Sequence, residues 1–156
     1  MKSKSFMFGG IAVVMLLLSL FLPVPAIQIT TDAWEDMIRT DRFEIGWIHS
    51  VEKEPWFETY EARDGKLYLT GTRFKTYGAG VPSEGKIIPS DDGFVHMALD
   101  REVPELNIFT SKDIKTTFYF GKGELPLYAP GGERWSVSIT HKTVPLWRLF
   151  GGAHHE

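Results

Sequence analysis

The stretch Phe43–Pro82, FEIGWIHSVEKEPWFETYEARDGKLYLTGTRFKTYGAGVP, decides the fold. Its first part alternates large apolar or aromatic residues with polar or small ones, the period-two pattern of a half-buried strand. Further on, Asp64-Gly65 separates two strand-like runs, and both of its positions tolerate positive φ, which favours a tight hairpin. The stretch therefore predicts three consecutive antiparallel strands, at residues 43–50, 56–62 and 66–77.

The turns predict how these strands pair. A two-residue turn at Asp64-Gly65 pairs Tyr60 with Leu69 and Glu58 with Gly71. A turn centred on Lys53-Glu54 pairs His49 with Glu58 and Trp47 with Tyr60. Directly opposed residues share a face, so one face should carry an apolar stripe that ends in a polar cluster. That cluster consists of His49, Glu58 and Arg73.

The rest of the chain continues the strand pattern. Strands are expected at 27–31, 94–99, 105–110, 116–120 and 135–141, with 143–150 as an edge strand or closing segment because Pro145 interrupts it. Residues 32–38 fit a helical turn with Asp32 as N-cap, or a loop. We expect an all-β, antiparallel sandwich or barrel of seven to eight short strands, formed by a single domain at 27–156 and preceded by one N-terminal hydrophobic helix.

The N-terminus predicts export. Lys2 and Lys4 precede 17 uncharged residues at 6–22, which as a helix would reach about 26 Å. Residues 1–26 fit a cleaved signal peptide ending at Ala26, and they equally fit a retained membrane anchor through residues 6–22. Both lysines lie before the apolar run, so the remainder is expected outside the cytoplasm, in the periplasm or on the outer face of the membrane. The chain has no cysteine, which excludes disulfides and a lipoprotein anchor.

Composition and spacing argue against several functions. A net charge of −3 gives no basic excess for nucleic acid. Ser50 and His49 are adjacent on a strand and should point to opposite faces, so a catalytic triad with Glu58 is not expected, and hydrolase activity is the weakest alternative. The five histidines lack metal-site spacing, and Gly78-Ala79-Gly80 has Ser83 where a dinucleotide motif needs glycine. We expect no catalytic residue, metal or cofactor.

The polar residues of the central stretch form the candidate ligand- or partner-binding set. A His49–Glu58 pair could hold two strands in register or contribute to recognition, and Arg73 could add a contact to a carboxylate ligand. The glycine turn could offer backbone N–H groups to an anion. The full set is His49, Ser50, Glu52, Glu58, Arg73, Gly78 and Gly80.

These residues also carry a resemblance. The blocks Ile48-His49-Ser50-Val51-Glu52 and Gly78-Ala79-Gly80-x-Pro82, with Pro55, Phe74 and Val144-Pro145-Leu146-Trp147, are similar to a family of small bacterial proteins of unknown function, number eighteen-fifty. Trp47 departs mildly from the tyrosine-like aromatic expected there. Members are typically encoded beside TRAP transporters of the TAXI subtype. The resemblance implies a non-catalytic accessory role with a component of such a transporter. A small-ligand module that binds carboxylates is the alternative.

Overall fold

The structure is a computed structural model that describes residues 2–128 and 134–150, with side chains from Gly10 onward. These residues form one α-helix, eleven strands and one 3-10 helix. In chain order they are α1 (Lys2–Ser19), β1 (Pro23–Thr31), β2 (Glu35–Ile38), β3 (Arg42–Ile48), β4 (Pro55–Arg63), β5 (Lys66–Phe74), β6 (Lys86–Ile88), β7 (Val95–Val103), β8 (Leu106–Thr110), β9 (Thr117–Phe120), β10 (Gly123–Pro126), β11 (Trp135–Pro145) and η1 (Leu146–Phe150).

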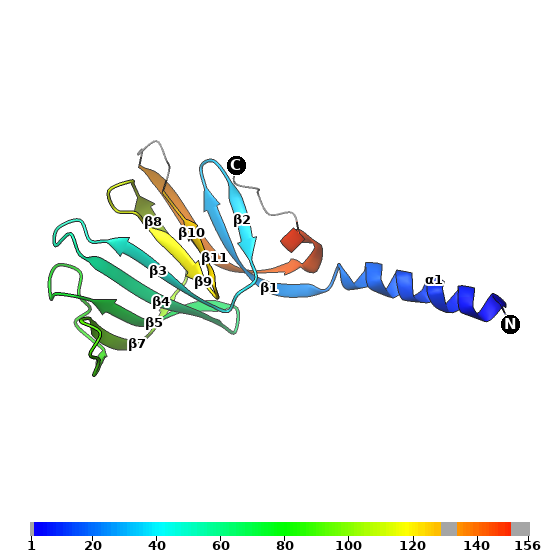
Figure 1. Ribbon diagram of the computed structural model, residues 1–156, viewed down its shortest axis with the longest axis horizontal. Coiled ribbons are helices and arrows are strands. Elements are labelled where there is room, and N and C mark those ends of the chain that lie inside the picture. Colours follow the sequence, from blue (N-terminus) through cyan, green and yellow to red (C-terminus); the bar gives the residue numbers. More distant parts are fainter. Residues whose placement is uncertain (1, 129–133, 151–156) are drawn as a thin grey trace.

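The strands form two antiparallel sheets, which confirms the predicted β-sandwich (Figure 1). The smaller sheet has the order β2-β1-β11-β8, and the larger has the order β10-β9-β3-β4-β5-β7-β6. Over the described residues the sheets do not close into a barrel. Their apolar faces meet in one core, where Ile29 of β1 and Ile139 of β11 join Ile45 and Leu69 of the larger sheet. The prediction of seven to eight strands was too low because it missed short strands such as β2, β6 and β10.

The predicted register between β3 and β4 was wrong. Ile45 lies opposite Glu58 rather than Ala62, and Trp47 lies opposite Trp56 rather than Tyr60, so each partner on β4 is shifted by four residues from the prediction. The turn spans 49–54 and is closed by two backbone bonds, from His49 N to Glu54 O at 2.8 Å and from Lys53 N to His49 O at 3.0 Å. Lys53 takes a φ of 59° there. A slip by an even number of residues, here four, preserves the face of every side chain but changes all the partners.

The hairpin of β4 and β5 was predicted correctly only near its turn. Tyr60 pairs with Leu69 as expected, but the register then shifts, and Glu58 pairs with Thr72 rather than with Gly71. The extra residue is Thr70, a β-bulge that inverts the alternation of everything beyond it in β5. Arg73 therefore lies on the face opposite to the one predicted.

The first strand also differs from the prediction. It begins at Pro23 rather than at residue 27, and residues 23–26 pair with the end of β11. β2 pairs with β1 only as far as residue 27, so Pro23 and Pro25 have β11 as their one neighbouring strand. Proline lacks a backbone N–H and is tolerated there, because no N–H is required on the unpaired side of the strand. The helical turn expected at 32–38 was wrong. Thr31 Oγ1 instead accepts the N–H groups of Ala33 and Trp34, which turns the chain back into β2.

The predicted closing segment is β11 followed by η1. β11 runs to Pro145 and lies between β1 and β8, so it is an inner strand and not an edge strand. Pro145, its last residue, lies opposite Pro23. η1 then folds back against the junction of α1 and β1.

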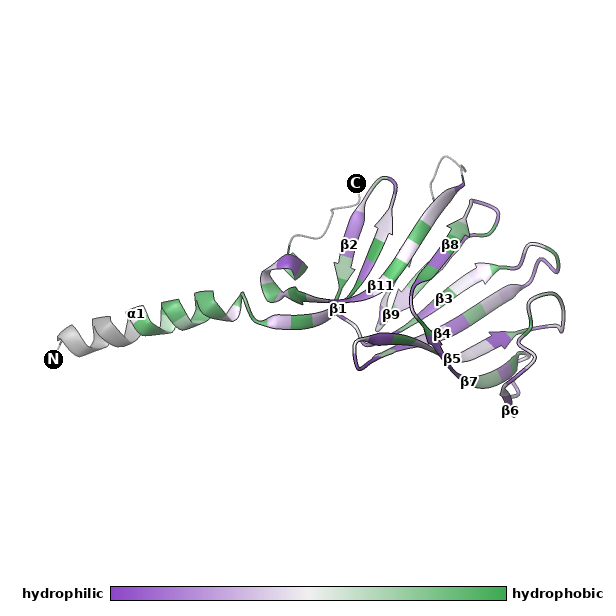
Figure 2. Cartoon of the chain, turned by 180° about the vertical axis from the view of Figure 1, so that it is seen from behind, coloured by the Kyte–Doolittle hydropathy of each residue, from purple (hydrophilic) through white to green (hydrophobic). Residues whose placement is uncertain are grey.

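α1 projects from the sandwich in line with β1 (Figure 1). Its described part is apolar, as the colouring of Figure 2 shows. In the part of the chain that the structure describes, no helix is long and apolar enough to cross a membrane. Export of the β-domain and the division at residue 26 remain predictions.

Candidate binding cleft

A cleft of about 390 Å³ opens between the two sheets. The larger sheet contributes residues of β3 and β4, the smaller contributes β8, and the segment after β8 closes one side. Most of the lining is apolar. The lining residues are Ile45, Trp47, Ile48, His49, Ser50, Glu58, Tyr60, Leu106, Asn107, Ile108, Phe109, Ile114 and Thr116. Three residues of the predicted set, His49, Ser50 and Glu58, therefore lie around one cavity, although His49 and Glu58 do not pair across the strands.

A carboxyl group lies inside this apolar lining. Glu58 sits opposite Ile45 on the core-facing side of β4, and the Tyr60 hydroxyl donates a hydrogen bond of 2.5 Å to its Oε2. Tyr60 is only 2% exposed. Burial raises the pKa of Glu58 above its usual value of 4.5, although the bond from Tyr60 opposes that rise. Burial, together with the neighbouring Glu58 carboxylate, also raises the pKa of Tyr60, so its hydroxyl remains a proton donor.

His49 lines the cleft but contacts Trp56 and Glu52 rather than Glu58. Its ring stacks on Trp56 with centroids 5.5 Å apart, and its Nδ1 contacts Glu52 Oε2. The backbone N–H groups of Val51 and Glu52 also approach Nδ1, at 3.3 and 3.5 Å. Those contacts are long, and Glu52 Oε2 is buried with no other partner in the described residues. The carboxylate contact therefore favours the tautomer that carries its proton on Nδ1.

Glu52 links this turn to the glycine loop. Its Oε1 accepts a hydrogen bond from Ala79 N at 3.3 Å. A side chain at Gly78 would collide with the same carboxylate, so only glycine allows the close approach. Gly80 has a φ of +85°, which also favours glycine. The two glycines thus shape a turn that Glu52 holds against the turn at 49–54. This arrangement favours a structural role for the glycine turn over anion binding.

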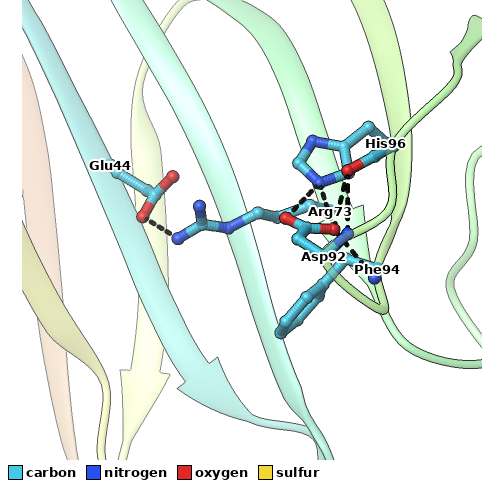
Figure 3. Close-up of polar contacts among 6 residues, drawn as sticks. Glu44, Arg73, Asp92, Phe94 and His96 are labelled. Carbon is cyan, nitrogen blue, oxygen red and sulfur yellow. Dashed lines mark hydrogen bonds and ion pairs between the residues drawn. The ribbon is translucent and has the colours of Figure 1, made fainter.

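Arg73 lies apart from the cleft, on the outer face of the larger sheet. Figure 3 shows it reaching from β5 across β4 to Glu44 of β3, where Nη2 donates to Oε1 at 2.7 Å. Its guanidinium also stacks over the Phe57 ring at 4.0 Å. Burial raises the pKa of Glu44, and the positive charge of Arg73 opposes that rise. Nearby, His96 Nε2 contacts the carboxylate of Asp92, whose pKa is lowered to about 2, chiefly by a hydrogen bond from Ser90.

The predicted cluster of His49, Glu58 and Arg73 was therefore wrong. Two of the three line the cleft, and the bulge at Thr70 places Arg73 behind the sheet, where it cannot reach a ligand bound beside Glu58. The cleft lining contains a carboxyl group and no lysine or arginine. Its chemistry suits an apolar group that carries a hydrogen-bond donor or a positive charge, and it suits a carboxylate poorly.

Sequence patterns missed two parts of the site. Tyr60 was assigned to the apolar stripe, yet its hydroxyl is the partner of Glu58. Asn107 and Phe109 come from β8, far along the chain, and no local signal connects them with β3. The bulge did have a signal, because an isolated glycine inside a strand, here Gly71, often marks one.

No hydrogen bond joins the Ser50 hydroxyl to the His49 ring among the described residues. Over the same residues, no group of three or more histidine, aspartate or glutamate side chains could hold a metal ion.

Fold and cleft together define a small antiparallel β-sandwich with a preformed, largely apolar cavity between its sheets. The chain belongs to the family described as Domain of unknown function (DUF1850), whose model matches residues 43–127, just over half of the 156 residues. The match confirms the family resemblance, and it runs from the start of β3 to the residue after β10. No curated protein and no solved structure gives a significant match to this chain.

Proposed function

We propose that this protein is a non-catalytic, extracytoplasmic binding module that acts as an accessory to a TAXI-type TRAP uptake system. One observation carries the binding role: a preformed cleft of about 390 Å³ whose apolar lining surrounds the single carboxyl group of Glu58. Cavities of this size and composition are typical of small-molecule sites. The location outside the cytoplasm rests on the basic and then apolar N-terminus. The transporter partner rests on the family resemblance.

The ligand is a small molecule, about the size of an amino acid, with an apolar part and either a positive charge or a hydrogen-bond donor at one end. A positive charge beside Glu58 would favour its ionised form and would offset the burial that raises its pKa. The apolar part would contact Ile45, Ile108 and Ile114. Displacement of water from such a lining supplies about 25 cal/mol per Å² of apolar surface buried.

A thermal-shift comparison tests the cleft. Apolar primary amines, matched carboxylates and matched neutral amides are added to the full chain, and a ligand that binds only the folded state raises the melting temperature by mass action. We expect stabilisation by amines, and loss of that stabilisation in Glu58→Gln. Arg73→Met is the matched control, because Arg73 lies outside the cleft and its replacement should leave the shift intact.

Stabilisation by carboxylates that disappears in Arg73→Met would instead support the carboxylate-binding alternative at the outer face. Amine stabilisation that persists in Glu58→Gln would contradict the assignment of the cleft.

The partner is tested separately by co-purification. The full chain, tagged at its C-terminus, is solubilised from membranes in mild detergent beside a TAXI-type binding protein and its permease. Recovery of either component is expected. Its absence in repeated preparations in which the tagged chain remains folded would refute the transporter association and would leave the cleft assignment standing.

A further inference from the structure

We propose that the apolar N-terminal segment is retained in the mature protein, and that the junction of α1, β1 and η1 is seated in lipid at the membrane–water interface. This inference goes beyond the proposed function, which holds for a secreted domain as well as for an anchored one.

Residues 23–26 are part of the sandwich and not a leader that precedes it. They pair with 142–145 of β11, and they make up four of the nine residues of β1. Ala26, the expected cleavage residue, is 0% exposed. Cleavage after it would open the ladder beside Val144, which is itself buried. Removal would therefore expose apolar surface and leave backbone groups of β11 without their partners.

η1 also depends on the segment that cleavage would remove. Leu146 N donates to Leu22 O at 3.0 Å, and Trp147 N donates to Leu20 O at 2.9 Å. These bonds fix the 3-10 helix against residues 20–22, which join α1 to β1. A chain that began at residue 27 would lose both acceptors, and η1 would lose its attachment to residues 20–22.

The apolar side chains of α1 are not confined to one face of the helix. Six consecutive side chains, at 13–18, are each between 54% and 67% exposed, and successive helical residues point about 100° apart. They therefore cover every side of the helix. A protein groove buries one face of an amphipathic helix, whereas an all-round apolar surface suits lipid. Lipid is for this reason the occupant that we assign.

Exposed aromatic rings gather where this helix meets the sandwich. Phe21 precedes β1, and Trp147 and Phe150 belong to η1, which the two backbone bonds hold at the same place. Phe150 is 75% exposed and Trp147 is 49% exposed. Tryptophan is enriched at the level of lipid headgroups, where its ring is apolar and its N–H is wet. This collar, Phe21, Trp147 and Phe150, marks the depth at which the sandwich meets the membrane.

The mass of the mature protein is the first test. The full chain, with a C-terminal tag, is produced in a bacterium with an active signal peptidase and recovered from both the membrane and the periplasm. We expect one species in the membrane fraction whose intact mass includes residues 2–26. A folded periplasmic species that begins at residue 27 would overturn the proposal.

The lipid contact is tested by fluorescence quenching. The full chain is reconstituted into phosphatidylethanolamine and phosphatidylglycerol vesicles with brominated acyl chains, which quench tryptophans located in lipid. We expect Trp147→Phe to remove most of the quenching that wild type shows. Trp47→Phe, which removes a ring at the cleft, should leave it unchanged. Equal quenching in wild type and Trp147→Phe would refute the collar, and neither test depends on a ligand in the cleft.

Discussion

Replacement of Tyr60 by phenylalanine should destabilise the protein in a pH-dependent way. The Tyr60 hydroxyl donates its bond to Glu58 from a position that is nearly closed to solvent. A hydrogen bond to a charged group contributes about 1.5–3 kcal/mol, and a bond between neutral groups contributes about 0.5–1.5 kcal/mol. Tyr60→Phe should therefore cost about 1.5–3 kcal/mol where Glu58 is ionised and about half as much where it is protonated.

The direction of this pH dependence follows from the raised pKa of Glu58. The folded protein holds this proton more tightly than the unfolded chain, so the contribution of Glu58 to stability is highest at low pH and falls as pH rises from about 4.5 through the folded pKa. Loss of the Tyr60 bond raises that pKa further, because the bond favours the ionised form. Each unit of pKa difference between the folded and unfolded states corresponds to about 1.4 kcal/mol. The decline with pH should be steeper in Tyr60→Phe than in wild type.

Urea unfolding at a series of pH values from 4 to 9 measures this effect. Glu58→Gln is the control background, since glutamine still accepts a hydrogen bond but does not titrate. In that background Tyr60→Phe should cost a constant amount at every pH. A cost of Tyr60→Phe that does not change with pH in the wild-type background would refute the coupling between the two residues.

Two further predictions concern the larger sheet. Thr72→Val should cost about 1–3 kcal/mol in urea unfolding, because Thr72 Oγ1 accepts a bond of 2.8 Å from Trp56 Nε1 and donates one of 3.0 Å to Phe57 O. In a Trp56→Phe background the cost should fall, since only the bond to Phe57 remains to be lost, and an unchanged cost there would contradict the Trp56 bond. Arg73→Met should cost about 1–2 kcal/mol at pH 8 and less at pH 4, because ionised Glu44 loses its partner. The control is Arg63→Met at an exposed ion pair, which should cost under about 0.5 kcal/mol. Equal costs for the two variants would refute the view that burial strengthens the Arg73–Glu44 pair.

Local patterns were sufficient where neighbouring residues set the geometry. The Asp64-Gly65 turn has φ values of 52° and 79°, as its sequence predicts, and the pairs next to it follow directly. The turn at 49–54 has no such dipeptide. Its length is set by the backbone bonds of His49 and by the stacking of Trp47 on Trp56, which the chain acquires only when the strands meet. The four-residue slip in the predicted register follows from that difference.

The candidate site likewise has one wall that the sequence predicted and one that it did not. His49 and Glu58 belong on one face by strand parity, and the structure places both around the cleft. The opposite wall comes from β8, because the chain crosses from one sheet to the other between β7 and β8. A crossover of this kind depends on how two apolar faces pack, so the strand sequences do not specify which distant strand completes the cavity.

The stretch Phe43–Pro82 by itself determined an antiparallel β architecture, because alternation and the Asp64-Gly65 turn act between residues close in sequence. The cysteine-free composition likewise required a fold held by its core alone. Only the tertiary structure decided the partners of each polar residue. The bulge at Thr70 turned Arg73 toward Glu44, and the packing of two sheets placed the Glu58 carboxyl beside Tyr60 inside an apolar cleft. Those outcomes depend on register and on long-range contacts, and a one-residue change in register reverses which face a side chain occupies.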